Sequence, residues 1–209
     1  MNPFKREDHV FHSPDFQEVV KDAIRFFNGT PVYQIPPPEK FLGAGVYSLY
    51  FTGKEPIYEA ISARNRTSYD LPIYVGKAVP SGWRQAREIG LDKPVSSVLY
   101  SRIREHGKSI DISENLSLSG FQCRFMILEK AESDLIGTIE AALIRFYRPL
   151  WNSFIDGFGN HDPGKGRYNQ AKSEWDVLHP GRSWANRCLG KPAELHRIEA
   201  KLKTYEDTI

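Results

Sequence analysis

Two short runs of aromatic and β-branched residues, at positions 44–51 and 72–77, constrain the fold of this chain more than any other feature. In the first run Tyr47, Leu49 and Phe51 alternate with the residues between them, which is the period of a β-strand. Pro72 is tolerated at the start of the second run because a first strand residue need not donate to the sheet. The residues between the runs are rich in Lys, Arg, Glu and Asn. The pattern therefore predicts two strands joined by an elaborated connection.

Helix and strand signals elsewhere predict a mixed α and β domain. Helix signals, including a Ser-Pro-Asp start at residue 13 and Gly or Pro at the ends, are strongest over four segments. The predicted helices are 14–27, 96–107, 135–147 and 192–205, and a third strand is predicted at 120–128. Apolar residues on both sides of that strand indicate that the sheet is covered on both faces. The predicted fold is α+β: a small antiparallel three-stranded sheet flanked by helices, with an N-terminal helix, an insertion and a C-terminal elaboration.

Composition excludes several classes of protein. The chain is 40% hydrophobic and 26% charged, as in ordinary globular proteins, and no apolar run is long enough for a membrane span. Its N-terminus lacks the pattern of a secretory signal. Cys123 and Cys188 are expected to be free thiols, so we expect a cytoplasmic protein with no membrane partner. The net charge of +2 means that any nucleic-acid-binding patch would have to be local.

The tripeptides Gly45-Val46-Tyr47 and Tyr74-Val75-Gly76 carry the most specific signal. From the strand pattern alone, two facing tyrosines would be a packing pair. The sequences of the two tripeptides, however, resemble the signature of the GIY-YIG nucleases. The predicted order of strand, strand, helix, strand and helix is also that of the GIY-YIG core. Further residues match the family motif in order along the chain; they are Arg102, His106, Glu140 and Asn152.

The resemblance implies a site that hydrolyses phosphodiester bonds. Tyr47 would activate the water with help from His106, although His106 could itself be the base, because a free phenol has a pKa of about 10 and an imidazole about 6.5. Tyr74 would bond the phosphate or the water, and Arg102 would bind phosphate oxygens. Glu140 would bind one Mg²⁺, for which Mn²⁺ is a plausible substitute.

The residues alone support plainer roles for the same side chains. Arg102 could form a surface salt bridge with Glu105, and Glu140 lies at the polar border of an apolar helix stripe. Asn152 would either orient the site or hold Glu140 and the phosphate. Other chemistry finds no support in the sequence: zinc-ligand spacing, a P-loop and a serine nucleophile elbow are all missing.

The resemblance covers about residues 43–152, and we expect one domain over residues 1–209. In it an N-terminal extension, 1–42, precedes the core, and a C-terminal elaboration, 153–209, serves DNA reading and dimer contacts. This last segment is rich in side chains that can bond base edges, namely Asn160, His161, Lys165, Arg167, Asn169, Gln170, Lys172, His179, Arg182 and Trp184. It could equally be an ordinary solvated region. Lys77 and Arg84 are further candidates for DNA contact.

A compact GIY-YIG enzyme of this size resembles a type II restriction endonuclease, of the branch that cuts the palindrome CCGCGG. That resemblance implies double-stranded DNA as the substrate, a homodimer to match the two-fold site, and a cognate DNA methyltransferase in the same system. Two alternatives stay open: a structure-specific or homing-type nuclease, and a non-catalytic DNA-binding module. The sequence fixes neither the target bases nor the stagger of the cut.

Overall fold

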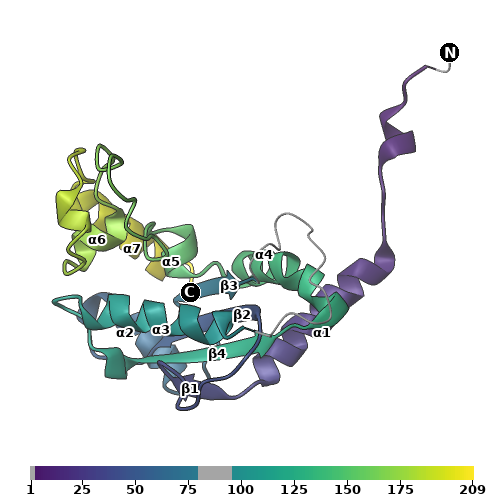
Figure 1. The fold of residues 1–209 in the computed structure, drawn as a ribbon, viewed down its shortest axis with the longest axis horizontal. Helices are drawn as coiled ribbons and strands as arrows, with labels where there is room; N and C mark the ends of the chain where they lie inside the picture. The colour runs from purple at the N-terminus through teal and green to yellow at the C-terminus, as the bar shows by residue number, and fades with distance from the viewer. Residues whose placement is uncertain (1–2, 80–95) are drawn as a thin grey trace.

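The computed structural model describes residues 3–79 and 96–209, and it is built around one antiparallel sheet (Figure 1). Its strands are β1 (Val32–Gln34), β2 (Gly45–Phe51), β3 (Tyr74–Ala78) and β4 (Phe121–Ile127). They lie in the order β1-β4-β2-β3, so β2 is central and β3 is an edge strand. Tyr47 is paired with Gly76 across β2 and β3, which brings the two tripeptides side by side.

The sheet has four strands rather than the predicted three, because β1 pairs with β4 at the edge opposite β3. β1 is only three residues long and is not buried, and prolines follow it closely. So short a segment shows no alternation, and its strand conformation depends on its partner.

Some α-helices of the described residues cover the two faces of the sheet. The last helices follow the sheet along the chain. The α-helices are α1 (Pro14–Gly29), α2 (Glu59–Asn65), α3 (Val98–Asp111), α4 (Ile136–Tyr147), α5 (Leu150–Ser153), α6 (Glu174–Leu178) and α7 (Leu195–Glu206). Short 3-10 turns lie at Arg6–His9, Pro56–Tyr58, Leu118–Gly120, Lys130–Leu135 and Ala185–Arg187. None of the helices in the described part of the chain is both long and apolar enough to cross a membrane.

Two hydrophobic cores lie on opposite faces of the sheet. On one face Tyr47, Leu49 and Phe51 pack beneath α2, α3 and the C-terminal segment. On the other, Val46 and Val75 pack against α1 and α4. The prediction that the sheet is covered on both faces is therefore confirmed, and the alternation of β2 decides which side chains enter each core.

Helix α3 continues past the predicted stop at Gly107 and ends at Asp111. A Cβ on Gly107 would lie 2.8 Å from Cγ2 of Ile35, so the residue is small because the chain at Ile35 packs closely against it. The glycine therefore reflects close packing of α3 against the segment after β1 rather than a helix end.

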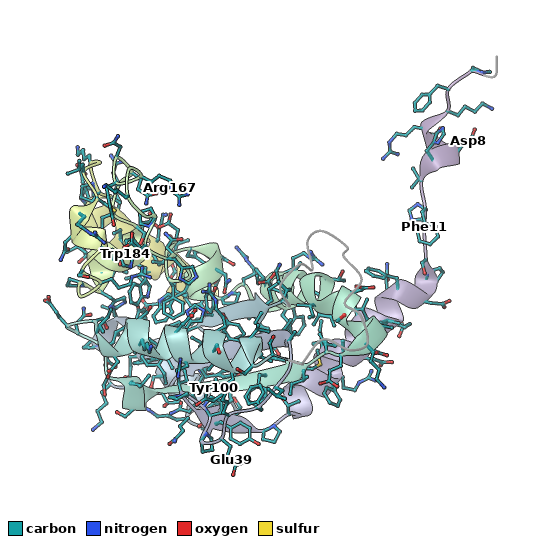
Figure 2. The ribbon with its side chains drawn as sticks, in the orientation of Figure 1. Asp8, Phe11, Glu39, Tyr100, Arg167 and Trp184 are labelled. Carbon is teal, nitrogen blue, oxygen red and sulfur yellow. The ribbon has the colours of Figure 1, made fainter. Side chains whose placement is uncertain are left out.

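Helix α1 begins where predicted, and Ser13 Oγ accepts the backbone N–H of Phe16. Its apolar stripe is only partly covered: Phe27 is buried in the core, whereas Phe16 remains 48% exposed. The N-terminal arm before α1, which includes Asp8 and Phe11, extends away from the sheet (Figure 2). Only the second half of α1 therefore supports the sheet.

Candidate active site

The two tyrosines of the signature lie close together beside Gly76 of β3. A Cβ on Gly76 would lie 2.4 Å from Tyr47 Oη, so glycine is needed at this position for the phenol to cross the strand. The Tyr47 and Tyr74 rings lie 6.2 Å apart between centroids. The second glycine of the signature thus makes room for the tyrosine of the first tripeptide.

Tyr47 and His106 form a buried hydrogen-bonded pair, with 2.6 Å between Oη and Nε2. Burial raises the pKa of Tyr47 well above its ordinary value; Tyr74 raises it further, and the Arg102 charge opposes the shift. Burial also lowers the pKa of His106 well below its ordinary value, and the Arg102 charge adds to this. A neutral imidazole beside a protonated phenol is the result, and in the tautomer that has no proton on Nε2, Tyr47 donates to His106. The pair can pass a proton from phenol to imidazole.

Arg102 extends from α3 toward this pair. Its Nη1 donates to Glu105 Oε2 at 3.4 Å, so the ion pair considered as the plainer role of Arg102 is present. Its Nη2 donates to the carbonyl of Gly159 at 3.2 Å, and Nη1 also contacts Nε2 of His161. Neither of these two partners was predicted for Arg102, because both come from the segment after the GIY-YIG core.

Glu140 lies on α4 and forms an ion pair with Lys77 of β3, with 2.5 Å between Oε2 and Nζ. Its charge contributes to the raised pKa values of Tyr47 and Tyr74, which places the carboxylate in the same electrostatic site. Among the described residues, no group of three or more His, Cys, Asp or Glu gathers as a metal cage. A single carboxylate fits Mg²⁺, which keeps several waters and takes a substrate phosphate as a further ligand. The site therefore fits such an ion with Glu140 as its protein ligand.

Asn152 uses both ends of its amide on the backbone of Val75. Its Oδ1 accepts the Val75 N–H at 2.8 Å and its Nδ2 donates to the Val75 carbonyl at 2.9 Å. An edge strand has unpaired backbone groups, and Asn152 satisfies them at the centre of β3. Of the two roles considered from sequence, this geometry favours orienting the strand that carries Tyr74 and Lys77.

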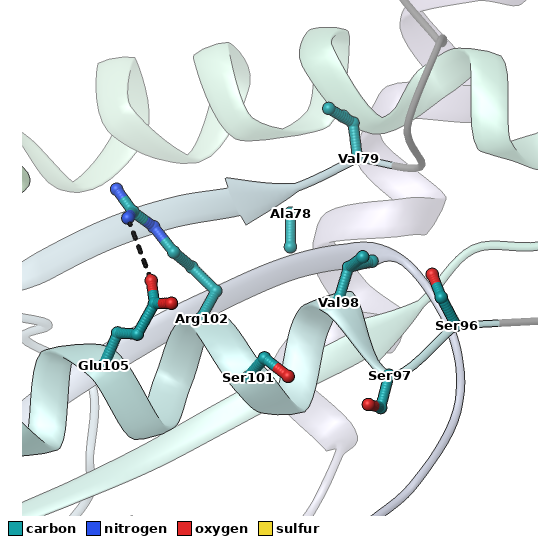
Figure 3. A pocket seen from close by; sticks show the side chains of 8 residues that line it. All are labelled: Ala78, Val79, Ser96, Ser97, Val98, Ser101, Arg102 and Glu105. Atoms are coloured by element: carbon teal, nitrogen blue, oxygen red, sulfur yellow. Dashed lines mark hydrogen bonds and ion pairs between the residues drawn. The ribbon is translucent and has the colours of Figure 1, made fainter.

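Two depressions border Arg102 and Glu105. One has a volume of about 470 Å³ and lies between the end of β3 and the start of α3 (Figure 3). The other has a volume of about 190 Å³ and lies between α3 and the loop at 157–161. Figure 3 shows Arg102 and Glu105 meeting above α3 at the border of the first depression. The Arg102 side chain, which is 23% exposed, thus borders a concave surface of the described residues.

The residues predicted to read DNA differ in their placement. Lys165, Arg167, Asn169 and Gln170 are exposed on the C-terminal segment, and Figure 2 shows Arg167 near its outer end. Arg84 lies outside the described residues. Arg182 corrects the prediction: it is 2% exposed and pairs with the equally buried Asp176, with 2.6 Å between Nε and Oδ1. In this structure the Arg182 guanidinium is therefore held inside the segment and is not exposed on its surface.

His179 also corrects the prediction, because it lies in a second buried tyrosine–histidine pair. Its Nε2 lies 2.5 Å from Tyr58 Oη, and its Nδ1 lies 2.8 Å from Asn115 Oδ1. Trp151 Nε1 donates to the same phenol at 3.1 Å. This hydrogen-bond network joins the insertion, α5 and the C-terminal segment. The amino-acid composition of the C-terminal segment does not distinguish a buried network from a solvated loop.

This second pair makes stability depend on pH. Burial lowers the pKa of His179 to about 3, whereas in the unfolded chain it is about 6.5. The unfolded state therefore binds a proton that the folded state does not, and the free energy of unfolding falls as the pH drops from about 6.5 toward 3. Urea unfolding at several pH values should show a fall of up to about 1.4 kcal/mol per pH unit from this residue. His179→Gln should have a shallower dependence, and an unchanged one would contradict the prediction.

Comparison with known proteins places these observations in a family. The family model of the Eco29kI GIY-YIG domain matches residues 39–206. The match extends the resemblance of residues 43–152 into the C-terminal segment. No curated protein sequence matches the chain. With most of its length matched, the chain belongs to the Eco29kI GIY-YIG family of restriction-type DNA nucleases.

Proposed function

We propose that this protein is a type II restriction endonuclease that hydrolyses double-stranded DNA at a GC-rich palindrome related to CCGCGG, with one Mg²⁺ in each active site. The observation that carries the proposal is the Tyr47–His106 pair, hydrogen-bonded at 2.6 Å and bordered by Arg102, in a chain of this family. A paired phenol and imidazole beside a guanidinium supplies both proton transfer and phosphate binding.

Water activation is assigned to Tyr47 and His106. As the water oxygen attacks phosphorus, its proton passes to Tyr47 Oη while the Tyr47 proton passes to Nε2 of His106. The phenol thus stays neutral overall, which its buried position favours, and the positive charge appears on His106, whose lowered pKa opposes it. The bond from phosphorus to the leaving oxygen breaks, and that oxygen takes a proton from solvent.

We assign the binding of the phosphate and the neutralisation of its charge to Arg102, Glu140 and Tyr74. The Arg102 guanidinium offers planar donors to the phosphate oxygens, and Tyr74 donates a further hydrogen bond. Glu140 would bind the Mg²⁺, or Mn²⁺ in its place, and such an ion neutralises charge that develops on the phosphate. Among the described residues, and without DNA or metal, Glu140 forms its ion pair with Lys77.

Sequence reading is assigned to the exposed C-terminal residues Lys165, Arg167, Asn169 and Gln170. A palindromic site is met by a two-fold symmetric protein, so we propose a homodimer. A cytoplasmic enzyme with this activity requires a cognate DNA methyltransferase to protect the host genome. A structure-specific or homing-type nuclease and a non-catalytic DNA-binding module are the alternatives.

Digestion of a sequenced plasmid with Mg²⁺ tests the proposal. Discrete bands whose mapped ends share one palindrome would support a restriction endonuclease. Nicks at irregular or branched positions would favour the structure-specific alternative, and binding without cleavage would favour the DNA-binding module.

Substitution of the pair identifies the base. Tyr47→Phe removes the hydroxyl that receives the water proton, so the single-turnover cleavage rate should fall by about 100-fold. His106→Ala should give a similar loss because it removes the final proton acceptor. Near-normal cleavage by Tyr47→Phe together with loss in His106→Ala would assign the base to His106 alone.

A further inference from the structure

The wall of the candidate active site opposite the sheet is built by the C-terminal segment, through the loop at residues 157–161. Phe158 is buried and stacks on His106 with 4.6 Å between ring centroids, and its edge meets Tyr74 at 4.9 Å. At Gly159 a Cβ would lie 2.9 Å from Tyr74 Oη, so glycine allows the loop backbone to approach the phenol. The loop thus contacts both Tyr74 and His106.

Arg182 holds this loop from behind through its backbone carbonyls. Its Nη1 donates to the carbonyls of Phe158 and Asn160 at 3.0 and 3.1 Å, and its Nη2 donates to that of Gly157 at 2.9 Å. The guanidinium carbon also lies 4.5 Å from the Trp175 ring centroid. Because three carbonyls of one short loop converge on one buried cation, the loop conformation is strongly determined.

The loop in turn provides two acceptors for Arg102. A guanidinium has five N–H donors, and three of those on Arg102 are directed at Glu105, Gly159 and His161. In the described part of the chain these three bonds involve only Nη1 and Nη2, and the guanidinium also interacts with the Tyr47 hydroxyl, which lowers the pKa of that phenol. The remaining Nε and Nη2 hydrogens lie on one edge of the planar group, which is the geometry that binds two phosphate oxygens.

Arginine can only donate, so its contact with Nε2 of His161 defines the state of that imidazole. Nε2 must accept, and the proton of the neutral ring must therefore be on Nδ1. A doubly protonated His161 would place a second donor and a second positive charge against the guanidinium.

We propose that His161 is a positioning residue of the nuclease: as a neutral acceptor it holds the end of the Arg102 guanidinium, together with the Gly159 carbonyl, so that the Nε edge faces the DNA phosphate. The proposal rests on the phosphate-binding role of Arg102 in the proposed function. It makes the C-terminal segment part of the catalytic apparatus as well as of DNA reading.

Protonation of His161 should release this hold. Burial lowers the pKa of His161, the Arg102 charge lowers it further, Glu105 opposes the shift, and Arg182 adds to it. The charged or titratable groups that share its surroundings are Arg102, Glu105, His106 and Lys108 on α3, and Asp162 and Arg182 in the C-terminal segment. The imidazole is thus neutral near neutral pH, and cleavage should weaken as the pH falls below about 6.5 through the lowered pKa.

Single-turnover cleavage by three variants tests the proposal. His161→Ala should lower the cleavage rate by about 10- to 100-fold while DNA affinity without a divalent metal changes by less than about threefold, because a misplaced guanidinium impairs the transition state. His161→Gln offers an untitrated acceptor, so it should recover most of the rate and lose the acid limb that His161 causes. His196→Ala, at an exposed position on α7, is the matched control and should cleave as the wild type does.

Wild-type cleavage by His161→Ala, or an unchanged acid limb in His161→Gln, would overturn the proposal while leaving the nuclease assignment intact. A readout independent of activity is the NMR spectrum of the Arg102 guanidinium in the free protein. Its Nη hydrogens should give separate signals in the wild type and merged signals in His161→Ala, because the held group rotates slowly about its Cζ–Nε bond. Merged signals in both proteins would contradict the proposed hold even if no plasmid were cut.

Discussion

Replacing Glu140 with Gln is expected to abolish DNA cleavage in Mg²⁺ while leaving DNA binding intact. The substitution keeps the shape of the side chain and removes the only charge that the site offers to a divalent cation from α4. Loss of several kcal/mol of transition-state stabilisation corresponds to a fall of about 1,000-fold or more in the cleavage rate. Single-turnover cleavage and a filter-binding assay on the same duplex measure the two effects separately.

A matched substitution at an exposed glutamate of α7, Glu199→Gln, should cleave as the wild type does. Normal turnover by Glu140→Gln would reject the metal-binding role of Glu140. Loss of binding together with cleavage would instead show that the ion pair between Glu140 and Lys77 maintains the DNA-binding surface.

Replacing Arg182 with Met is expected to destabilise the protein by about 3–5 kcal/mol, because it leaves the Asp176 carboxylate buried without a counter-ion. Both side chains are 2% exposed, and the loop carbonyls that Arg182 satisfies would lose their donors as well. The free energy of unfolding from urea titration measures the effect.

Arg187→Met is the control, since Arg187 forms a similar pair with Asp162 at 2.7 Å but is 56% exposed. Exposed pairs contribute about 0–1 kcal/mol, so this variant should be close to the wild type. A second control, Arg182→Met combined with Asp176→Leu, removes both charges and should regain part of the loss. Equal stabilities for Arg182→Met and Arg187→Met would contradict the role given to burial.

The elements that carry the part of the candidate site within the GIY-YIG core could be predicted because they depend on local patterns. Alternation in β2 places Tyr47 on a defined face, and the helical periods of α3 and α4 place Arg102 and Glu140 on theirs. These elements and their order are confirmed by the structure and the family match.

The C-terminal half could not be predicted, because its structure is not periodic. Arginine, histidine and glycine in a segment without sustained alternation are equally compatible with a solvated loop and with a buried network. Arg182 bonds the carbonyls of the 157–161 loop, and His179 bonds Tyr58 and Asn115, which are all separated from them along the chain. Neither composition nor spacing records such contacts.

The hydrogen bonds between Arg182 and the 157–161 loop have a consequence during protein synthesis. Tyr47, Tyr74, His106 and Glu140 are translated well before Arg182, yet the loop that contacts Arg102 is held only when Arg182 has been added. A nascent chain on the ribosome would therefore carry most of the cleaving groups without the wall that orders them. Until residue 182 has been added, the loop therefore lacks the cation to which its carbonyls bond.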